Sequence, residues 1–157
     1  MTTATRGEDS IWIAAAPQLV YDVVSDVPRM GERSPECYRC EWLDGATAAA
    51  VGARFRGYNR LGLLRWSTTS TVLAADPGRE FAFTVMSRGG REETRWRYVM
   101  EERDGGTLLS ESYEFVWCPA VARVAEIPFP RDRQLRRGVR RTLLAAKASA
   151  EALRSAS

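Results

Sequence analysis

One stretch near the end of the chain decides the fold: residues 132–152, with the sequence DRQLRRGVRRTLLAAKASAEA. Asp132 is a suitable N-cap, and the prolines at 128 and 130 keep a helix from beginning earlier. At about 1.5 Å per residue this helix is ~30 Å long, enough to cross a small domain. Its apolar side chains recur every three or four residues and so share one helix face: Leu135, Val139, Leu143, Ala146, Ala150 and, one residue beyond the stretch, Leu153.

The chain before this helix is predicted to be mostly β-strand, because apolar and polar residues alternate with a period of two. A first strand is expected at Ser10–Ala15, followed by a helix from Pro17 to about Asp26 and a short helical turn at Val27–Glu32. Six further strands are expected at Glu36–Leu43, Val51–Arg60, Leu64–Ala74, Arg79–Ser87, Glu93–Glu102 and Thr107–Trp117. Residues 120–129 fit either the start of a helix or an ordered loop.

Tight turns join these strands, so consecutive strands are antiparallel and alternation leaves one sheet face buried. Only one long helix is present to cover that face, and the sheet therefore has to curve around it. Gly52, Gly57 and Gly62 are the expected points of bending. The predicted fold is α+β: a curved antiparallel seven-stranded sheet wrapped around the C-terminal helix, with two short helices between the first two strands. We expect one domain over residues 1–157, with residues 1–8 disordered.

The composition is that of an ordinary globular domain, with 45% hydrophobic and 27% charged residues among 157. No window is apolar enough for a membrane span and the N-terminus has no apolar signal region, so the expected location is the cytoplasm. A net charge of +3 does not imply nucleic acid, and no nucleic-acid partner is expected. The oligomeric state is left open.

The three cysteines, Cys37, Cys40 and Cys118, do not form a recognisable metal site. The chain contains no histidine to complete a zinc site around the C-x-x-C pair, and a thioredoxin-like context is absent. We therefore expect no metal and no cofactor, and interpret the thiols as incidental, half-buried side chains.

Several strings of this sequence resemble the START-like (SRPBCC) superfamily, also called the Bet v 1-like or helix-grip fold, and within it the bacterial polyketide cyclase/dehydrase branch. They are residues 11–17, VYDVVSDVPRM at 20–30, Ser34-Pro35-Glu36, VGARFRG at 51–57, Trp66, Pro77-Gly78-Arg79 with Phe81 and Phe83, and Gly106-Thr107 before Glu111. Relatives often have tryptophan just before Ser-Pro, where this chain has Arg33. The resemblance implies a deep apolar cavity between sheet and helix that binds lipids, polyketides or similar molecules.

The inward face of the predicted sheet supplies the candidate site, because an apolar pocket with a few polar groups is typical of small-molecule binding. Glu111 is the sharpest candidate: in an apolar cavity its pKa would rise, making it a general acid or base. The alternatives are an ion pair with an arginine or a place at a wet rim. The predicted ligand-binding residues are Phe55, Asn59, Trp66, Thr68, Ser70, Phe83, Trp96, Tyr98, Glu111, Tyr113, Phe115 and Leu143.

Three functions remain open from the sequence. The first is a carrier of a small hydrophobic molecule, lipid or polyketide-like. The second is a polyketide aromatase/cyclase or dehydratase in which Glu111 and Tyr113 handle protons. The third is an interaction protein that uses the basic helix face formed by Arg136, Arg137, Arg140 and Arg141, although such a face is usually only solvated.

Overall fold

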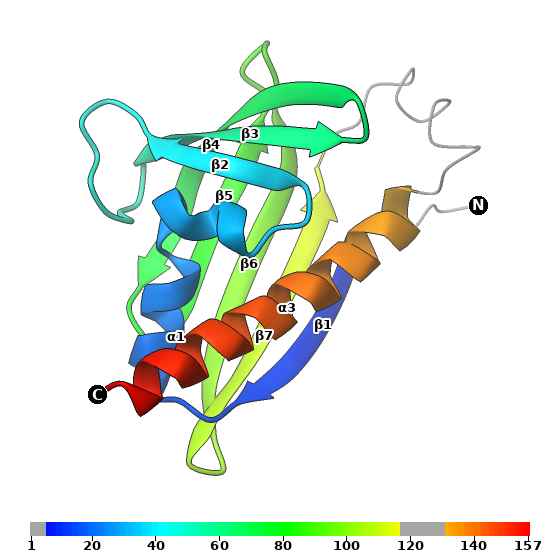
Figure 1. Cartoon of the computed structure of the whole chain (residues 1–157). Coiled ribbons are helices and arrows are strands. Elements are labelled where there is room, and N and C mark those ends of the chain that lie inside the picture. Colours follow the sequence, from blue (N-terminus) through cyan, green and yellow to red (C-terminus); the bar gives the residue numbers. More distant parts are fainter. Residues whose placement is uncertain (1–5, 117–130) are drawn as a thin grey trace.

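The computed structural model describes residues 6–116 and 131–157. A seven-stranded antiparallel sheet curves around a long C-terminal helix, so the chain has a helix-grip fold (Figure 1). Its elements are β1 (Arg6–Ile13), α1 (Pro17–Val24), η1 (Val27–Glu32, a 3₁₀ helix), β2 (Cys37–Trp42), β3 (Arg54–Leu61), β4 (Leu64–Asp76), β5 (Glu80–Met86), β6 (Glu92–Arg103), β7 (Gly106–Phe115) and α3 (Arg131–Ser155). The predicted fold and element order are confirmed.

The sheet has the order β1-β7-β6-β5-β4-β3-β2, so every neighbouring pair except β1–β7 is a sequential hairpin. The last strand, β7, returns to pair with β1, from Arg6 opposite Glu114 to Ile13 opposite Thr107. The first two strands are therefore the two edges of the sheet. α1 and η1 connect them, which places these short helices across the chain's path from one edge to the other (Figure 1).

Bulges accompany the curvature of the sheet, and the predicted role of the glycines is only partly right. Extra residues lie in β2 between Cys37 and Arg39, in β4 between Val72 and Ala74, and in β6 between Glu92 and Thr94. A bulge adds an unpaired residue to one strand and increases its bend and twist. Gly52 and Gly62 have φ angles of 87° and 59° and lie in turns outside the strands. Gly57 alone lies within a strand.

The predicted apolar stripe of α3 is buried, with the exception of its last member. Leu135, Val139, Leu143, Ala146 and Ala150 are each at most 6% exposed, whereas Leu153 is 44% exposed. Leu153 was wrongly included because a spacing pattern does not reveal how far the sheet extends beneath the helix. The helix continues to Ser155, and Asp132 lies inside it as the second residue, so the helix does not begin after Asp132.

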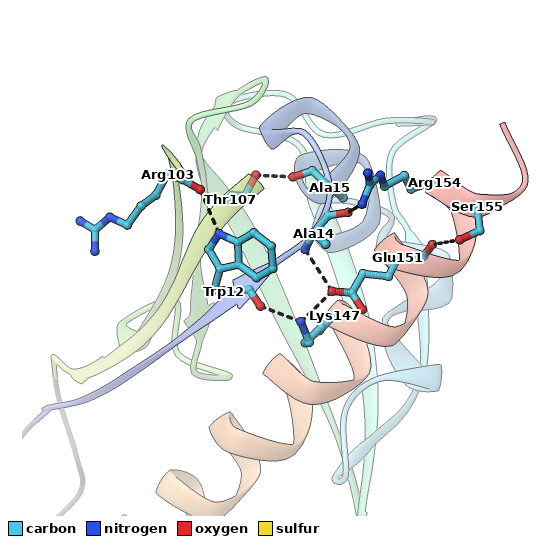
Figure 2. A network of polar contacts seen from close by, with 9 residues as sticks. All are labelled: Trp12, Ala14, Ala15, Arg103, Thr107, Lys147, Glu151, Arg154 and Ser155. Carbon is cyan, nitrogen blue, oxygen red and sulfur yellow. Dashed lines mark hydrogen bonds and ion pairs between the residues drawn. The ribbon is translucent and has the colours of Figure 1, made fainter. Parts of the chain in front are cut away.

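The outer edge of β1 is covered by basic side chains of α3. Three carbonyls of β1 and the Ala14 carbonyl just after it accept hydrogen bonds from them: Arg136 to Arg6, Arg140 to Ser10, Lys147 to Trp12, and Arg154 to Ala14. Around the last two, the Glu151 carboxylate also accepts bonds from the Ala14 amide and the Lys147 ammonium, as Figure 2 shows. These contacts satisfy backbone groups that an edge strand otherwise presents to solvent.

Other differences from the prediction are local. β1 begins at Arg6, so residues 6–8, expected to be disordered, are strand paired with β7. β3 begins at Arg54 rather than Val51, because residues 51 and 52 turn the chain before it. Trp117 and the ambiguous residues 120–129 lie outside the described residues. No helix in the described ranges is both long and apolar enough to cross a membrane.

Candidate functional site: a cavity between the sheet and the C-terminal helix

A cavity of about 970 Å³ lies between the concave face of the sheet and the N-terminal half of α3. Strands β2 to β7 contribute lining residues, α1 contributes Val24 and η1 contributes Met30. The lining residues of α3 are Arg133, Gln134, Leu135, Arg137, Gly138, Val139, Arg141, Thr142 and Ala146. Exposed lining residues, among them Pro35, Leu61 and Arg137, show where the cavity meets solvent. A space of this size, enclosed by several elements, suits a small organic molecule.

Ten of the twelve predicted ligand-binding residues line this cavity: Phe55, Asn59, Trp66, Thr68, Ser70, Phe83, Trp96, Tyr98, Glu111 and Phe115. They share the cavity because alternate residues of each strand point to the concave face of the sheet, as the alternation in the sequence predicted. Aromatic rings make much of the wall. Phe55 and Phe83 pack edge to face with centroids 5.1 Å apart, at the centre of a core cluster that continues behind the lining.

Tyr113 and Leu143 do not line the cavity, which corrects the prediction for both. Tyr113 is 1% exposed, and its ring lies over Gly7, its partner on β1, where any Cβ would be only 2.6 Å from the ring. Because Gly7 has no side chain, the Tyr113 ring can lie against the edge strand β1. Leu143 is fully buried in the hydrophobic core. Parity identifies the inward face of an element, but it does not separate core from cavity wall.

Glu111 is a carboxyl group enclosed in the cavity wall. Its residue is 2% exposed, and its Oε1 accepts a hydrogen bond of 2.9 Å from the Tyr98 hydroxyl. Its Oε2 is buried and has no hydrogen-bond partner among the described residues. Burial raises the pKa of Glu111 to about 8, against the lowering effect of the Tyr98 bond and with a further small rise from Asp9. The two alternatives considered for Glu111, an ion pair with an arginine and a place at a solvated rim, do not match this geometry.

Tyr98 and Glu111 therefore form a buried pair that keeps its protons at neutral pH. Burial, with Glu111 next to it, also raises the pKa of Tyr98 well above its usual value. A protonated carboxyl can donate a hydrogen bond, and the same group can take part in proton transfer near neutral pH. The pair can thus recognise an oxygen of a ligand or act on it.

Sequence reasoning missed part of the wall, on η1 and β2. Arg33 is 8% exposed, lines the cavity, and donates a hydrogen bond of 3.1 Å to the Asp26 carbonyl. Burial lowers its pKa, but a guanidinium remains charged in proteins. The sequence did contain a signal for Arg33: it directly precedes Ser34-Pro35, at the position where the family often has tryptophan. Cys37 and Cys40 also line the cavity.

Three arginines of α3 border the cavity on a second helix flank. Arg133, Arg137 and Arg141 follow one another at intervals of four, all three line the cavity, and all are exposed. Within residues 6–116 and 131–157, none of the three guanidinium groups has a hydrogen bond or an ion pair. The four arginines predicted as one basic face are thus divided: Arg136 and Arg140 contact β1, whereas Arg137 and Arg141 border the cavity. The four-residue spacing was visible in the sequence and could have separated the two flanks.

The other polar lining residues are neutral or acidic. The Asn59 amide donates to the Thr68 hydroxyl at 3.4 Å, and Ser70 is 2% exposed. Burial raises the pKa of Glu93, which also borders the space. No group of three or more metal-ligating side chains occurs in the part of the chain that the structure describes.

Comparison with known proteins identifies the family. The family model described as polyketide cyclase/dehydrase and lipid transport matches residues 4–154. The polyketide-cyclase-like protein Cgl2372 of Corynebacterium glutamicum is 37% identical, with 99% of this chain and 90% of that chain covered and a TM-score of 0.55. None of the curated proteins matches the sequence.

Two aromatase/cyclases share the fold at lower identity. The Zhui aromatase/cyclase from Streptomyces sp. R1128 is 21% identical, with 93% of each chain covered and a TM-score of 0.67. The di-domain aromatase/cyclase StfQ, from the steffimycin biosynthetic pathway, is 16% identical over 96% of this chain and 52% of that chain, with a TM-score of 0.76. With its helix-grip fold, its cavity and a family match over nearly its whole length, the chain belongs to the polyketide cyclase/dehydrase and lipid transport family.

Proposed function

We propose that the protein binds a small, largely apolar molecule that carries a hydrogen-bonding oxygen, and that the molecule occupies the cavity between the sheet and α3. The observation that carries this proposal is the buried Glu111 carboxyl, one oxygen of which has no partner among the described residues. An unpaired buried polar atom costs about 1–3 kcal/mol, so a ligand oxygen that pairs with it gains affinity. The aromatic wall supplies the apolar contacts.

The arginines at the rim suggest the charge of the ligand. Arg133, Arg137 and Arg141 border the cavity without an acidic partner among the described residues, and Arg33 adds a charge in the wall. A molecule with an anionic end and an apolar body matches this distribution, because the body displaces water from the rings while the anion remains at the solvated rim. Lipid-like acids and polyketide-like acids both have this form.

A matched pair of variants tests the binding site with 8-anilinonaphthalene-1-sulfonate, an anionic aromatic probe that fluoresces in apolar surroundings. Thr68→Phe adds a phenyl ring inside the cavity, whereas Ser67→Phe adds the same ring to an exposed position on the same strand. We expect Thr68→Phe to weaken saturable probe binding and Ser67→Phe to leave it unchanged. Equal binding by both variants, at unchanged melting temperature, would contradict the proposed site.

A second candidate function is acid–base catalysis on a bound polyketide-like chain, as in a cyclase or dehydratase. The Glu111–Tyr98 pair favours it, because a carboxyl with a pKa of about 8 both gives and takes a proton near neutrality. Tyr98 takes the place of Tyr113 in this hypothesis, since Tyr113 lies outside the cavity wall.

Glu111→Gln and Tyr98→Phe separate the carrier from the enzyme. The test ligand is a linear poly-β-ketone analogue. If the protein is a carrier, both variants should keep most of their binding, and neither they nor the wild type should turn the analogue over. An enzyme should keep binding but lose turnover by about 10²–10⁴-fold in Glu111→Gln. Product formation is followed by mass spectrometry, with Glu114→Gln, an exposed change on the same strand, as the control.

A further inference from the structure

The C-x-x-C pair, interpreted from the sequence as two incidental thiols, has both of its side chains on the concave face of β2. In a regular strand, residues three apart point to opposite faces of the sheet. Here the bulge places Tyr38 and Arg39 together opposite Tyr58, so that Cys37 lies opposite Asn59 and Cys40 opposite Gly57. Both thiols thereby face the same side, and their sulfur atoms are 3.2 Å apart.

The surroundings leave room for this sulfur pair. Gly57 lies beside both: a Cβ there would be 3.5 Å from the Cys37 Sγ and 3.7 Å from the Cys40 Sγ. The thioether of Met30, on η1, lies 3.9 Å from the Cys40 Sγ. Bulges next to functional sites commonly redirect a side chain, and this one brings together two groups that react with each other.

The pair borders the cavity. Cys37 and Cys40 are 9% and 5% exposed, and both line the cavity wall. The two thiols also differ in acidity: the hydrogen bond from the Cys40 S–H lowers the pKa of Cys37, and the same bond together with burial raises the pKa of Cys40. Cys37 is therefore the better nucleophile of the two, because the thiolate is the attacking form.

We propose that Cys37 and Cys40 are a reversible dithiol–disulfide couple in the wall of the cavity, oxidised by small disulfide molecules that enter it. This inference is independent of the proposed function, since it requires only an open cavity. Its basis is the sulfur contact of 3.2 Å, which has to shorten to a bond of about 2.05 Å.

The chemistry balances as two thiol–disulfide exchanges. The Cys37 thiolate attacks one sulfur of the small disulfide; its S–S bond breaks, a mixed disulfide forms on Cys37, and one small thiolate leaves. Cys40 then loses its proton and attacks the Cys37 sulfur, which releases the second small thiolate and closes the Cys37–Cys40 bond. The protein loses two protons and two electrons, and the small disulfide becomes two thiols.

Glutathione disulfide tests the proposal in a Cys118→Ser background, which removes the third cysteine. We expect the intact monomer to lose the mass of two hydrogen atoms on oxidation and to regain it with dithiothreitol. In Cys40→Ser the reaction should stop at a glutathione adduct on Cys37, whereas Cys37→Ser should react far more slowly. Circular dichroism melting establishes that each variant is folded.

Two outcomes would overturn the proposal. One is a folded Cys118→Ser protein that keeps both thiols in excess glutathione disulfide. The other is an adduct that stays on Cys37 without closing, even though Cys40 is present. The route is tested separately: Thr68→Phe, which narrows the cavity beside the thiols, should slow the oxidation, and Ser67→Phe should leave its rate unchanged. Equal rates in these two variants would refute oxidation through the cavity.

Discussion

The two ends of α3 contact the same sheet in opposite ways. Around Lys147, Glu151 and Arg154 the helix is joined to β1 by hydrogen bonds to the chain at Trp12 and Ala14 (Figure 2). We call this the closed end. Toward its N-terminus the helix keeps two bonds to β1, from Arg136 to Arg6 and from Arg140 to Ser10, but its other flank borders the cavity through Arg133 and Arg137. We call this the open end.

The difference lies in how polar groups are satisfied. At the closed end even buried hydroxyls have partners: Thr107 is fully buried and donates to the Ala15 carbonyl at 2.7 Å. At the open end the Oε2 atom of Glu111 is buried without a partner among the described residues, and arginines at the rim lack counter-charges there. Polar groups are therefore paired within the protein at the closed end, whereas the open end keeps groups that a ligand can engage.

The largest expected effect concerns the open end and follows from the raised pKa of Glu111. Because the folded protein holds this proton more tightly than the unfolded chain, the stability it contributes is complete below about pH 4.5. It is lost as the pH rises through about 8. The difference of about 3.5 units corresponds to at most about 5 kcal/mol. Urea unfolding across this range should show wild type losing stability relative to Glu111→Gln. A parallel pH profile for the two proteins would contradict the assignment, and Glu114→Gln serves as the exposed control.

The next effect compares the two ends along one apolar stripe. Leu143→Ala should lower the free energy of unfolding by about 2–5 kcal/mol, because it leaves a new void in a packed core. Leu135→Ala should lower it less, since Leu135 already borders the cavity, and should alter probe binding. Denaturant unfolding and probe titration measure the two quantities. Equal losses of stability would mean that the open end is as tightly packed as the closed end.

A smaller effect is expected at the closed end from Thr107→Val. The variant keeps the shape of the side chain but leaves the Ala15 carbonyl without its donor, which should cost about 1–3 kcal/mol. Thermal unfolding measures it, and Ser112→Ala, in the same strand, is the control. An unchanged melting temperature would show that water or another group replaces the hydroxyl.

The smallest effects separate the two basic flanks of α3. Lys147→Met removes the bonds to Trp12 and Glu151 and should lower the melting temperature slightly, by less than Thr107→Val, because the ion pair is partly solvated. Arg137→Met should leave the melting temperature unchanged and weaken binding of the anionic probe. If the two variants exchanged these phenotypes, the division between the flanks would be wrong.

The sequence predicted the fold well because periodicity reports which face of an element is buried. The alternation in β6 and β7 correctly placed Trp96, Tyr98 and Glu111 inward. The predicted apolar stripe of α3 is buried except for its last member, Leu153. Hairpin turns fixed the order of six strands. These are local signals, and the fold follows from them because neighbours in sequence are neighbours in the sheet.

The candidate site was predicted less completely, because it depends on contacts between distant elements. The packing of Tyr113 over Gly7 requires the β1–β7 pairing, which no local pattern reveals. The Tyr98–Glu111 bond requires a register between strands, and the shared face of Cys37 and Cys40 requires a bulge that shifts the alternation by one residue. Period-two alternation assumes regular strands and therefore does not reveal which residues share a face beside a bulge.

The pairing of β1 also constrains how the protein is made. Ser10 contacts Ser110 across the strands, 100 residues later, and the Trp12 carbonyl is bound by Lys147, 135 residues later. A ribosome that releases the chain from its N-terminus delivers β1 long before either partner exists. The hairpins β2 to β7 can form in order of synthesis, because their contacts are local, whereas β1 must wait for both β7 and α3. The first strand to be synthesised is thus the last that can be placed, and its docking coincides with closure of the helix over the sheet.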